Sequence, residues 1–307
     1  MERLEVLKTY KLYIDGKFPR SESGRSTVIA SAEGKVFAHT CKASRKDFRD
    51  AVEAARKAQQ GWQDATAYLR GQILYRIAEM IEGKRAELAY AIDAIEGGGK
   101  STRGGKGAGR KGAGSTGGGM KGDEEVTLAI DRVVAYAGWA DKYAQVLGCN
   151  NPVASAHYNF TVPEPTGVVC VVAPDRPSLL GLVSLACPVI CAGNTAVVVA
   201  SEVNPIPAAV LAEACATGDV PGGVVNILTG ARGELVPFIA GHREVDGVHT
   251  ANVEDVHMAA LRAGAGENVK RVTTRSGVDF TDRESCESPW WIEPFVEMKT
   301  IWHPAAS

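Results

Sequence analysis

The sequence has little charge excess, no paired cysteine motif and no cluster of metal ligands. The formal net charge is −2 over 307 residues, so the chain carries no electrostatic footprint for nucleic acid or for an anionic membrane surface. No CxxC pair and no Cys/His group has the spacing of a metal site, and we expect no bound metal. The scattered cysteines favour free thiols in a reducing, cytoplasmic compartment: Cys41, Cys149, Cys170, Cys187, Cys191, Cys215 and Cys286.

No segment of the sequence is predicted to enter a membrane. Residues 1–17 contain no basic region followed by a continuous apolar stretch, so we predict no signal peptide. Residues 178–201 carry no charge and are long enough to span a bilayer. Pro188, Gly193 and Asn194 interrupt them, however, and a β-branched run follows. We therefore interpret this stretch as a buried helix, a tight turn and a buried strand.

Apolar residues at helical spacing dominate the first half of the chain. Ser44 is placed to cap the first helix. Before it, residues 10–18 alternate apolar and polar side chains around Asp15-Gly16, which predicts a β-hairpin. We expect amphipathic helices over three ranges: 44–62, 67–95 and 123–146.

Residues 97–122 separate the second and third of these helices and have an unusual composition. Thirteen of the 26 residues are glycine, six are lysine or arginine, and none is acidic. Such a segment has little to bury and a high entropic cost of ordering, so we predict a flexible loop. Its basic residues could contact nucleic acid, but no aromatic residues interleave with them to stack on bases. A solvated loop is the favoured interpretation.

The second half of the chain alternates strand and helix patterns. This alternation predicts an α/β fold with a doubly wound parallel sheet and right-handed crossovers. We expect strands over 167–173, 195–200, 224–228 and 246–249, and helices over 179–191, 206–216 and 233–239.

The C-terminal residues 290–304 alternate again and carry large apolar side chains, Met298 and Trp302 among them. An isolated terminal strand must pair with something. We expect it to pair with the hairpin at 10–18 or with a neighbouring subunit. Because its side chains would expose a large apolar area in water, we predict that tail and hairpin together build an oligomer interface.

A frame of small and turn-forming residues runs through the predicted strand–helix repeats. It consists of Gly167, Pro174, Ala192-Gly193-Asn194-Thr195, Ser201-Glu202 and residues 220–226 (VPGGVVN). In this frame the chain resembles the cofactor-binding core of the aldehyde dehydrogenase superfamily. Three further segments resemble the shortened second module of the two-module, class 16 members: residues 137–143 (AGWADKY), 268–271 (NVKR) and 299–304 (KTIWHP).

The resemblance implies a Rossmann-like cofactor-domain fold over residues 1–275, including the N-terminal hairpin and helices and the loop at 97–122. Only 32 residues follow Arg275, whereas a separate catalytic domain needs roughly 100 or more. We therefore expect the family's catalytic domain to be missing and interpret residues 276–307 as a C-terminal oligomerisation tail. In the two-module relatives the resembling module serves architecture rather than turnover.

The positions that perform catalysis in the family hold other residues here. The resemblance places Arg176 at the family's oxyanion-holding Asn and Arg275 at its general-base Glu. A guanidinium is not a useful base at neutral pH. Cys286 is the only cysteine after the core, and its acidic neighbours should raise rather than lower the pKa of its thiol. We assign no catalytic residue.

The cofactor-binding positions are also changed. The family Lys that holds the adenosine ribose falls on Val199, which has no donor. The family's F-T-G-S, which approaches the pyrophosphate, reads His249-Thr250-Ala251-Asn252, and Ala251 adds a Cβ where close approach is needed. Ser201 and Glu202 survive as candidate cofactor-binding residues, so the resemblance implies weak NAD binding or none.

Three functional hypotheses remain. The leading one is a non-catalytic pseudoenzyme of the aldehyde dehydrogenase family that assembles with itself or with a full-length paralogue. The main alternative is an active NAD-dependent aldehyde oxidoreductase that oxidises an aldehyde to an acid with an unrecognised nucleophile. A third is a nucleic-acid or nucleotide-binding module that acts through residues 97–122.

Overall fold

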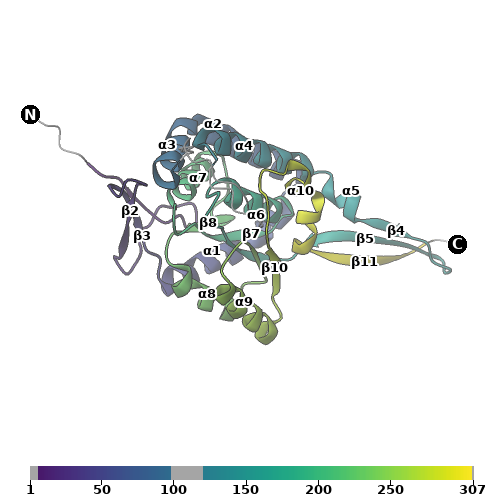
Figure 1. The fold of residues 1–307 in the computed structure, drawn as a ribbon. Helices are drawn as coiled ribbons and strands as arrows, with labels where there is room; N and C mark the ends of the chain where they lie inside the picture. Colours follow the sequence, from purple (N-terminus) through teal and green to yellow (C-terminus); the bar gives the residue numbers. More distant parts are fainter. Residues whose placement is uncertain (1–5, 98–119, 306–307) are drawn as a thin grey trace, which may run out of the picture.

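Five parallel strands form the centre of the molecule, in the order β10-β9-β6-β7-β8 (Figure 1). The computed structural model describes residues 6–97 and 120–305. The strands are β6 (Val168–Val172), β7 (Thr195–Val199), β8 (Val225–Leu228), β9 (Gly247–Ala251) and β10 (Arg271–Arg275). The predicted doubly wound parallel sheet is confirmed, and every strand expected between residues 167 and 249 overlaps an observed one.

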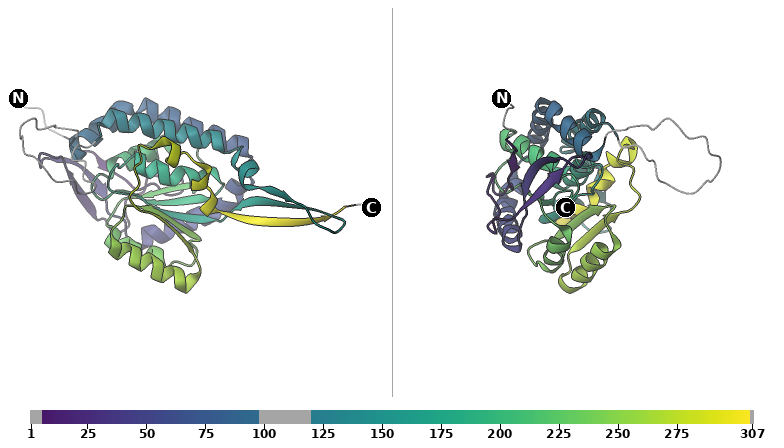
Figure 2. Two further views of the ribbon diagram at one scale, coloured as in Figure 1. Left: turned by 45° about the vertical axis from the view of Figure 1, so that its right-hand side comes forward. Right: turned by 60° about the vertical axis from the view of Figure 1, so that its left-hand side comes forward.

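Helices cover both faces of this sheet (Figure 2). In β6, Val168, Cys170 and Val172 pack on the side of α1 (Arg45–Asp64), α8 (Arg232–Gly241) and α9 (Asp255–Asn268). The alternate residues Val169 and Val171 pack on the opposite side. There lie α6 (Leu180–Cys191) and α7 (Ile206–Thr217), with α2 (Ala67–Gly83), α3 (Arg85–Glu96) and α4 (Gly122–Trp139) outside them. Burial on both faces explains why β6 and β7 are continuous apolar runs.

Helix α1 begins where its sequence predicts. Ser44 Oγ accepts a hydrogen bond from the Asp47 N–H at 3.2 Å, and Asp47 Oδ2 accepts one from the Ser44 N–H at 2.7 Å. This reciprocal capping box satisfies two N–H groups that would otherwise have no partner. Phe48 and Val52 are fully buried on the face that packs against the sheet.

Two of the predicted helices are each divided in the structure. Residues 67–95 form α2 and α3 rather than one helix. The break follows Gly83, where the Lys84 N–H turns back to the Ile81 carbonyl at 2.9 Å. Glycine is a poor helix former, so a tightened turn competes well at this point. Residues 123–146 likewise divide into α4 and α5 (Tyr143–Leu147).

The hairpin predicted at 10–18 is reduced to its turn. Asp15 and Gly16 have φ of 54° and 72°, as a tight hairpin turn requires. Ile14 and Lys17 pair across it, and the Leu12 N–H donates to the Pro19 carbonyl at 3.1 Å, but no longer ladder forms. Tyr13 pairs instead with Ile227 of β8. The strands of this region form a separate small sheet: β1 (Thr9–Tyr10), β2 (Ser26–Ala30) and β3 (Val36–Cys41), in the order β1-β3-β2.

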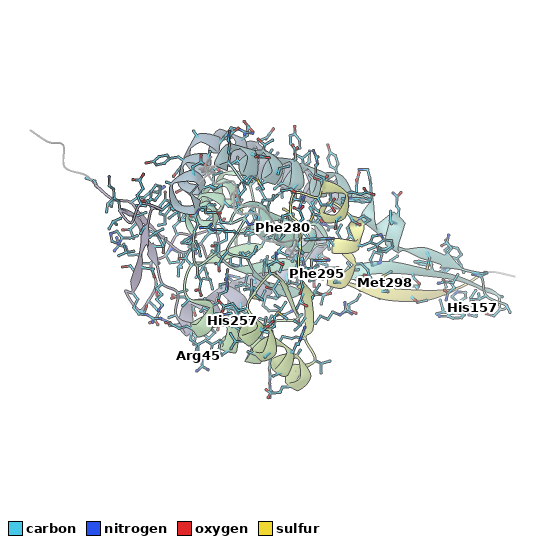
Figure 3. The ribbon with its side chains drawn as sticks, viewed as in Figure 1. Arg45, His157, His257, Phe280, Phe295 and Met298 are labelled. Carbon is cyan, nitrogen blue, oxygen red and sulfur yellow. The ribbon has the colours of Figure 1, made fainter. Side chains whose placement is uncertain are left out.

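A second three-stranded sheet projects from the opposite end of the body (Figures 1 and 2). It contains β4 (Cys149–Asn151), β5 (His157–Pro165) and β11 (Val296–Pro304), in the order β11-β5-β4. Strand β11 therefore pairs with β5 of its own chain, so the expected pairing with the hairpin at 10–18 was wrong. Pairing with a neighbouring subunit, and an oligomer interface built by tail and hairpin, stay predictions; within one chain the two segments lie at opposite ends. Figure 3 shows Met298 and His157 on the projecting sheet, and Phe280 and Phe295 against the body.

The chain between β10 and β11 packs on the body instead of extending. It forms α10 (Arg283–Cys286) and two 3-10 turns, η1 (Pro289–Trp291) and η2 (Glu293–Phe295). The extended run expected from residue 290 thus begins only at Val296. Three side chains of α4 hold the segment. Arg132 Nη2 donates to the Phe280 carbonyl at 2.9 Å, Tyr136 to that of Cys286 at 2.8 Å, and Trp139 to that of Glu287 at 2.7 Å.

Most of the predicted glycine-rich loop at 97–122 lies outside the described residues. Within residues 6–97 and 120–305, no helix is both long and apolar enough to cross a bilayer.

Candidate functional site

The loops that follow β6, β7 and β8 meet at the carboxyl edge of the sheet, where ligands bind in folds of this topology. Asp175 follows β6, and Arg232 begins α8 after β8. Their side chains form a bidentate ion pair, with Nη1–Oδ2 and Nη2–Oδ1 distances of 2.8 Å. Arg232 is buried and also donates to the Ala173 carbonyl at 2.6 Å. Burial opposes ionisation of Asp175, but the bonds from Arg232 outweigh it and hold the pKa of Asp175 below its usual value.

The two candidate cofactor-binding residues belong to this same cluster. Ser201 Oγ donates to the Asp175 carbonyl at 3.1 Å. The Glu202 N–H donates to Asp175 Oδ1 at 2.9 Å, and Glu202 Oε1 accepts from the Arg232 N–H. Val199 is fully buried at the end of β7. The structure thus brings Ser201 and Glu202 together, but it engages their polar atoms with Asp175 and Arg232.

Two carboxylates lie nearby at the N-terminus of α6. Glu125 of α4 is 1% exposed and accepts hydrogen bonds from the Leu179 N–H at 2.7 Å and the Leu180 N–H at 3.1 Å. Glu96, at the end of α3, accepts from Asn204 at 2.9 Å and from Ser178. Burial, and then the charge of Glu96, raises the pKa of Glu125 to about 7. Burial also raises the pKa of Glu96.

Arg275, the residue at the expected general-base position, is held by two aromatic side chains. Its Nε donates to His249 Nε2 at 2.9 Å, and its guanidinium lies 3.9 Å from the centre of the Trp291 ring. His249 Nδ1 is 2.9 Å from the Leu185 carbonyl, so this nitrogen carries the proton and Nε2 accepts. Burial, reinforced by the charge of Arg275, lowers the pKa of His249 to about 3, and the imidazole is neutral.

The remaining candidates for chemistry are separated or buried. Arg176, placed at the oxyanion position, is exposed on the loop after β6. Cys286 is buried, and burial raises the pKa of its thiol, with the charge of Asp282 a smaller cause in the same direction. Of the cysteines that the structure describes, Cys149 alone is exposed, and it lies on β4 of the projecting sheet. Residues 6–97 and 120–305 contain no group of three or more His, Cys, Asp or Glu that could hold a metal ion.

Sequence reasoning did not identify Asp175, Arg232 or the Glu96–Glu125 pair. Asp175 and Arg232 are 57 residues apart, and only the closure of the sheet brings them together. Glu96 and Glu125 flank the glycine-rich segment, where helical periodicity gives no sign that either side chain is buried. A charged residue directly after an apolar strand, such as Asp175, was the one available signal.

The chain matches known proteins over most of its length. A model of the aldehyde dehydrogenase family matches residues 18–107 and 114–279. An aldehyde dehydrogenase of Aspergillus niger is 31% identical over 270 residues, which cover 87% of this chain and 50% of that protein. Retinal dehydrogenase 2 of Mus musculus is 31% identical over 275 residues, which cover 88% of this chain and 49% of that protein. The chain therefore spans about half the length of the curated relatives it matches.

Solved structures of aldehyde dehydrogenases have a fold similar to that of this chain. The NAD+ complex of an aldehyde dehydrogenase from Bacillus cereus superposes with a TM-score of 0.76 at 25% identity, covering 88% of this chain and 51% of that one. An aldehyde dehydrogenase from Brucella melitensis biovar abortus 2308 has the same TM-score at 20% identity, which supports the fold alone. The α/β fold with its parallel sheet is that of the family's cofactor domain. With a family model that matches well over half of its residues, this chain belongs to the aldehyde dehydrogenase family.

Proposed function

We propose that the chain is a non-catalytic member of the aldehyde dehydrogenase family that acts as a structural subunit. The observation that carries this proposal is the state of Arg275. A permanently charged guanidinium occupies the expected general-base position, bound to His249 and stacked on Trp291. It cannot accept a proton there, and its half-buried side chain is bound to its neighbours.

NAD is the cofactor that family membership implies, and the Bacillus cereus relative was solved in complex with it. The residues at the carboxyl edge of the sheet fit its ribose poorly. Val199 offers no donor, Ser201 donates to Asp175, and one Glu202 oxygen is taken by Arg232. Losing two charge-assisted bonds, each worth about 1.5–3 kcal/mol, weakens binding by roughly a hundredfold or more. We therefore infer weak NAD binding or none.

The partner in this proposal is a second copy of the chain or a full-length paralogue, as for the second module of class 16 members. The projecting sheet supports this choice. Met298 and Trp302 are about half exposed on β11, and Tyr158 is exposed on β5, without a covering layer from the described chain. The sheet order leaves the outer edge of β11 unpaired by any described strand, and an unpaired edge is a template for another chain. We assign residues 276–307 to assembly and 1–275 to the cofactor-domain unit, in a cytoplasmic protein.

Two measurements on the full chain test the proposal. Oxidation of a panel of aliphatic and aromatic aldehydes, followed by NADH fluorescence, should show no turnover, and calorimetry should show no micromolar affinity for NAD. The alternative, an active NAD-dependent aldehyde oxidoreductase, rests on family membership. Turnover that disappears in Cys286→Ala or Cys149→Ser would establish that alternative and refute the pseudoenzyme.

A further inference from the structure

The outer helix layer carries a hollow of about 470 Å³ between α2 and α4. Small residues form its floor because the two helices approach closely there. A Cβ on Gly71 would lie 2.9 Å from the Ala137 carbonyl oxygen, so this position requires glycine. A Cβ on Gly138 would meet nothing within 4 Å, so the absence of that side chain leaves space open to solvent.

Two bulky side chains stand beside this hollow on the same face of α2. Tyr68 is 69% exposed and Tyr75 is 52% exposed, and their spacing of seven residues places them one above the other. Val134 of α4 is also exposed on this face. The surface therefore carries both aromatic knobs and a hole of side-chain size, whereas a solvated helix pair would carry mainly polar residues.

We propose that this face is a two-fold interface, in which each copy of the chain inserts Tyr75 into the hollow of the other. A two-fold contact uses the same patch on both subunits, so one patch must hold both knob and hole. Seating an aromatic ring against Gly71 and Gly138 removes its apolar surface from water on both sides. This interface is separate from assembly through β11, because it lies on a different surface of the chain.

The charges around the hollow fit the same symmetry. Helices α2 and α4 are antiparallel: Gly71 packs on Ala137 near the end of α4, whereas Arg85, just after α2, donates to Thr127 in its first turns at 2.8 Å. Glu79 therefore lies at one end of the hollow and Lys142 at the other. A two-fold axis that lies in the contact plane, perpendicular to the line from Glu79 to Lys142, places Glu79 of one copy over Lys142 of the second. A different protein with an acidic or a basic surface would not require opposite charges at the two ends of the hollow.

The layer is also large enough for a stable contact. Helices of 17 and 18 residues are about 26 Å long, and two helices side by side are about 20 Å wide. The resulting face, on the order of 500 Å² in projection, approaches the roughly 800 Å² of accessible surface that each partner contributes to a standard interface.

The test uses the full chain and two substitutions that leave the monomer intact. Gly138→Gln fills the hole without a clash, and Tyr75→Ser removes the knob from an exposed position. Gly61→Gln is the matched control, because Gly61 also lies on a helix with open space around its Cβ, but on α1, away from the hollow. Both glycine replacements should raise the melting temperature slightly, since glutamine is the better helix former.

Light scattering and sedimentation should then show that each hollow variant has half the assembled mass of the wild type, or dissociates at a concentration at least tenfold higher. Gly61→Gln should match the wild type. A wild-type chain that is monomeric, or a Gly138→Gln variant with unchanged mass, overturns the proposal. Neither substitution touches β11 or the Arg275 cluster, so an unchanged mass of Gly138→Gln would leave the proposed function standing. A monomeric wild type would leave only a full-length paralogue as its partner, whereas turnover of aldehydes would refute the function and leave this interface untouched.

Discussion

Replacing Glu125 by Gln should make the protein more stable at neutral and alkaline pH. Glu125 is 1% exposed, and its pKa is raised from an ordinary value of 4.5 to about 7. A carboxyl group whose pKa is higher in the folded state stabilises the fold fully below the unfolded-state pKa. That stabilisation is lost as the pH rises through the folded-state pKa. Because one pKa unit corresponds to about 1.4 kcal/mol, the wild type should lose on the order of 3 kcal/mol between about pH 4.5 and pH 7 from this group.

Gln keeps the carbonyl oxygen that accepts from the Leu179 and Leu180 N–H groups, but it does not titrate. The bonds from these N–H groups to the carboxylate are already included in the net rise of its pKa. Glu125→Gln should therefore be close to the wild type near pH 5 and more stable by about 3 kcal/mol at pH 8.

Urea unfolding followed by tryptophan fluorescence at several pH values measures this difference directly. Comparing variant and wild type at the same pH cancels the contributions of the other carboxyl groups, except for Glu96, whose charge contributes to the raised pKa of Glu125. Glu124→Gln is the control, because it removes the same charge from an exposed position one residue earlier on α4. A difference in unfolding free energy that does not change with pH would refute the assignment of Glu125 as a buried titrating group.

Four further outcomes are expected. Asp175→Ala should destabilise the fold by about 3 kcal/mol in urea unfolding, because it leaves the buried Arg232 without its partner. We expect this lower end of the cost of breaking a buried ion pair because the Asp175 side chain is 38% exposed. Adding Arg232→Met should recover most of the loss, and an additive double variant would contradict the pairing. Ser44→Ala should cost about 1 kcal/mol by removing the N-cap of α1, measured by the same assay; no loss would mean that Asp47 alone caps the helix. Deleting residues 296–307 should convert an assembled species into monomer or aggregate in light scattering, and an unchanged mass would exclude β11 from assembly.

The elements that sequence could predict are those that depend on local chemistry. The run of valines in β6 and β7 indicated strands buried on both faces, and Ser44 as an N-cap indicated the start of α1. Both signals act within a few residues. The break after Gly83 was missed because the apolar spacing continues through it, and only the tightened turn at Lys84 interrupts the helix. The partner of β11 was missed because strand pairing across more than 130 residues leaves no local trace.

In the candidate site, too, the sequence shows single residues but not their contacts with residues distant in the chain. In the sequence, Arg275 and His249 are two separate departures from the family pattern. Random substitution at a site that is no longer under selection would also produce separate departures. In the structure they touch: Arg275 donates to His249 at 2.9 Å, and Trp291 covers the guanidinium. Arg275 depends on His249 as its acceptor, because a half-buried guanidinium without an acceptor costs about 1–3 kcal/mol. His249→Phe should therefore destabilise the chain by about that amount, and Arg275→Leu should rescue it. Rescue would mean that Arg275 and His249 form one packing unit at the expected general-base position, whereas additive losses would mean that the two residues only happen to be neighbours.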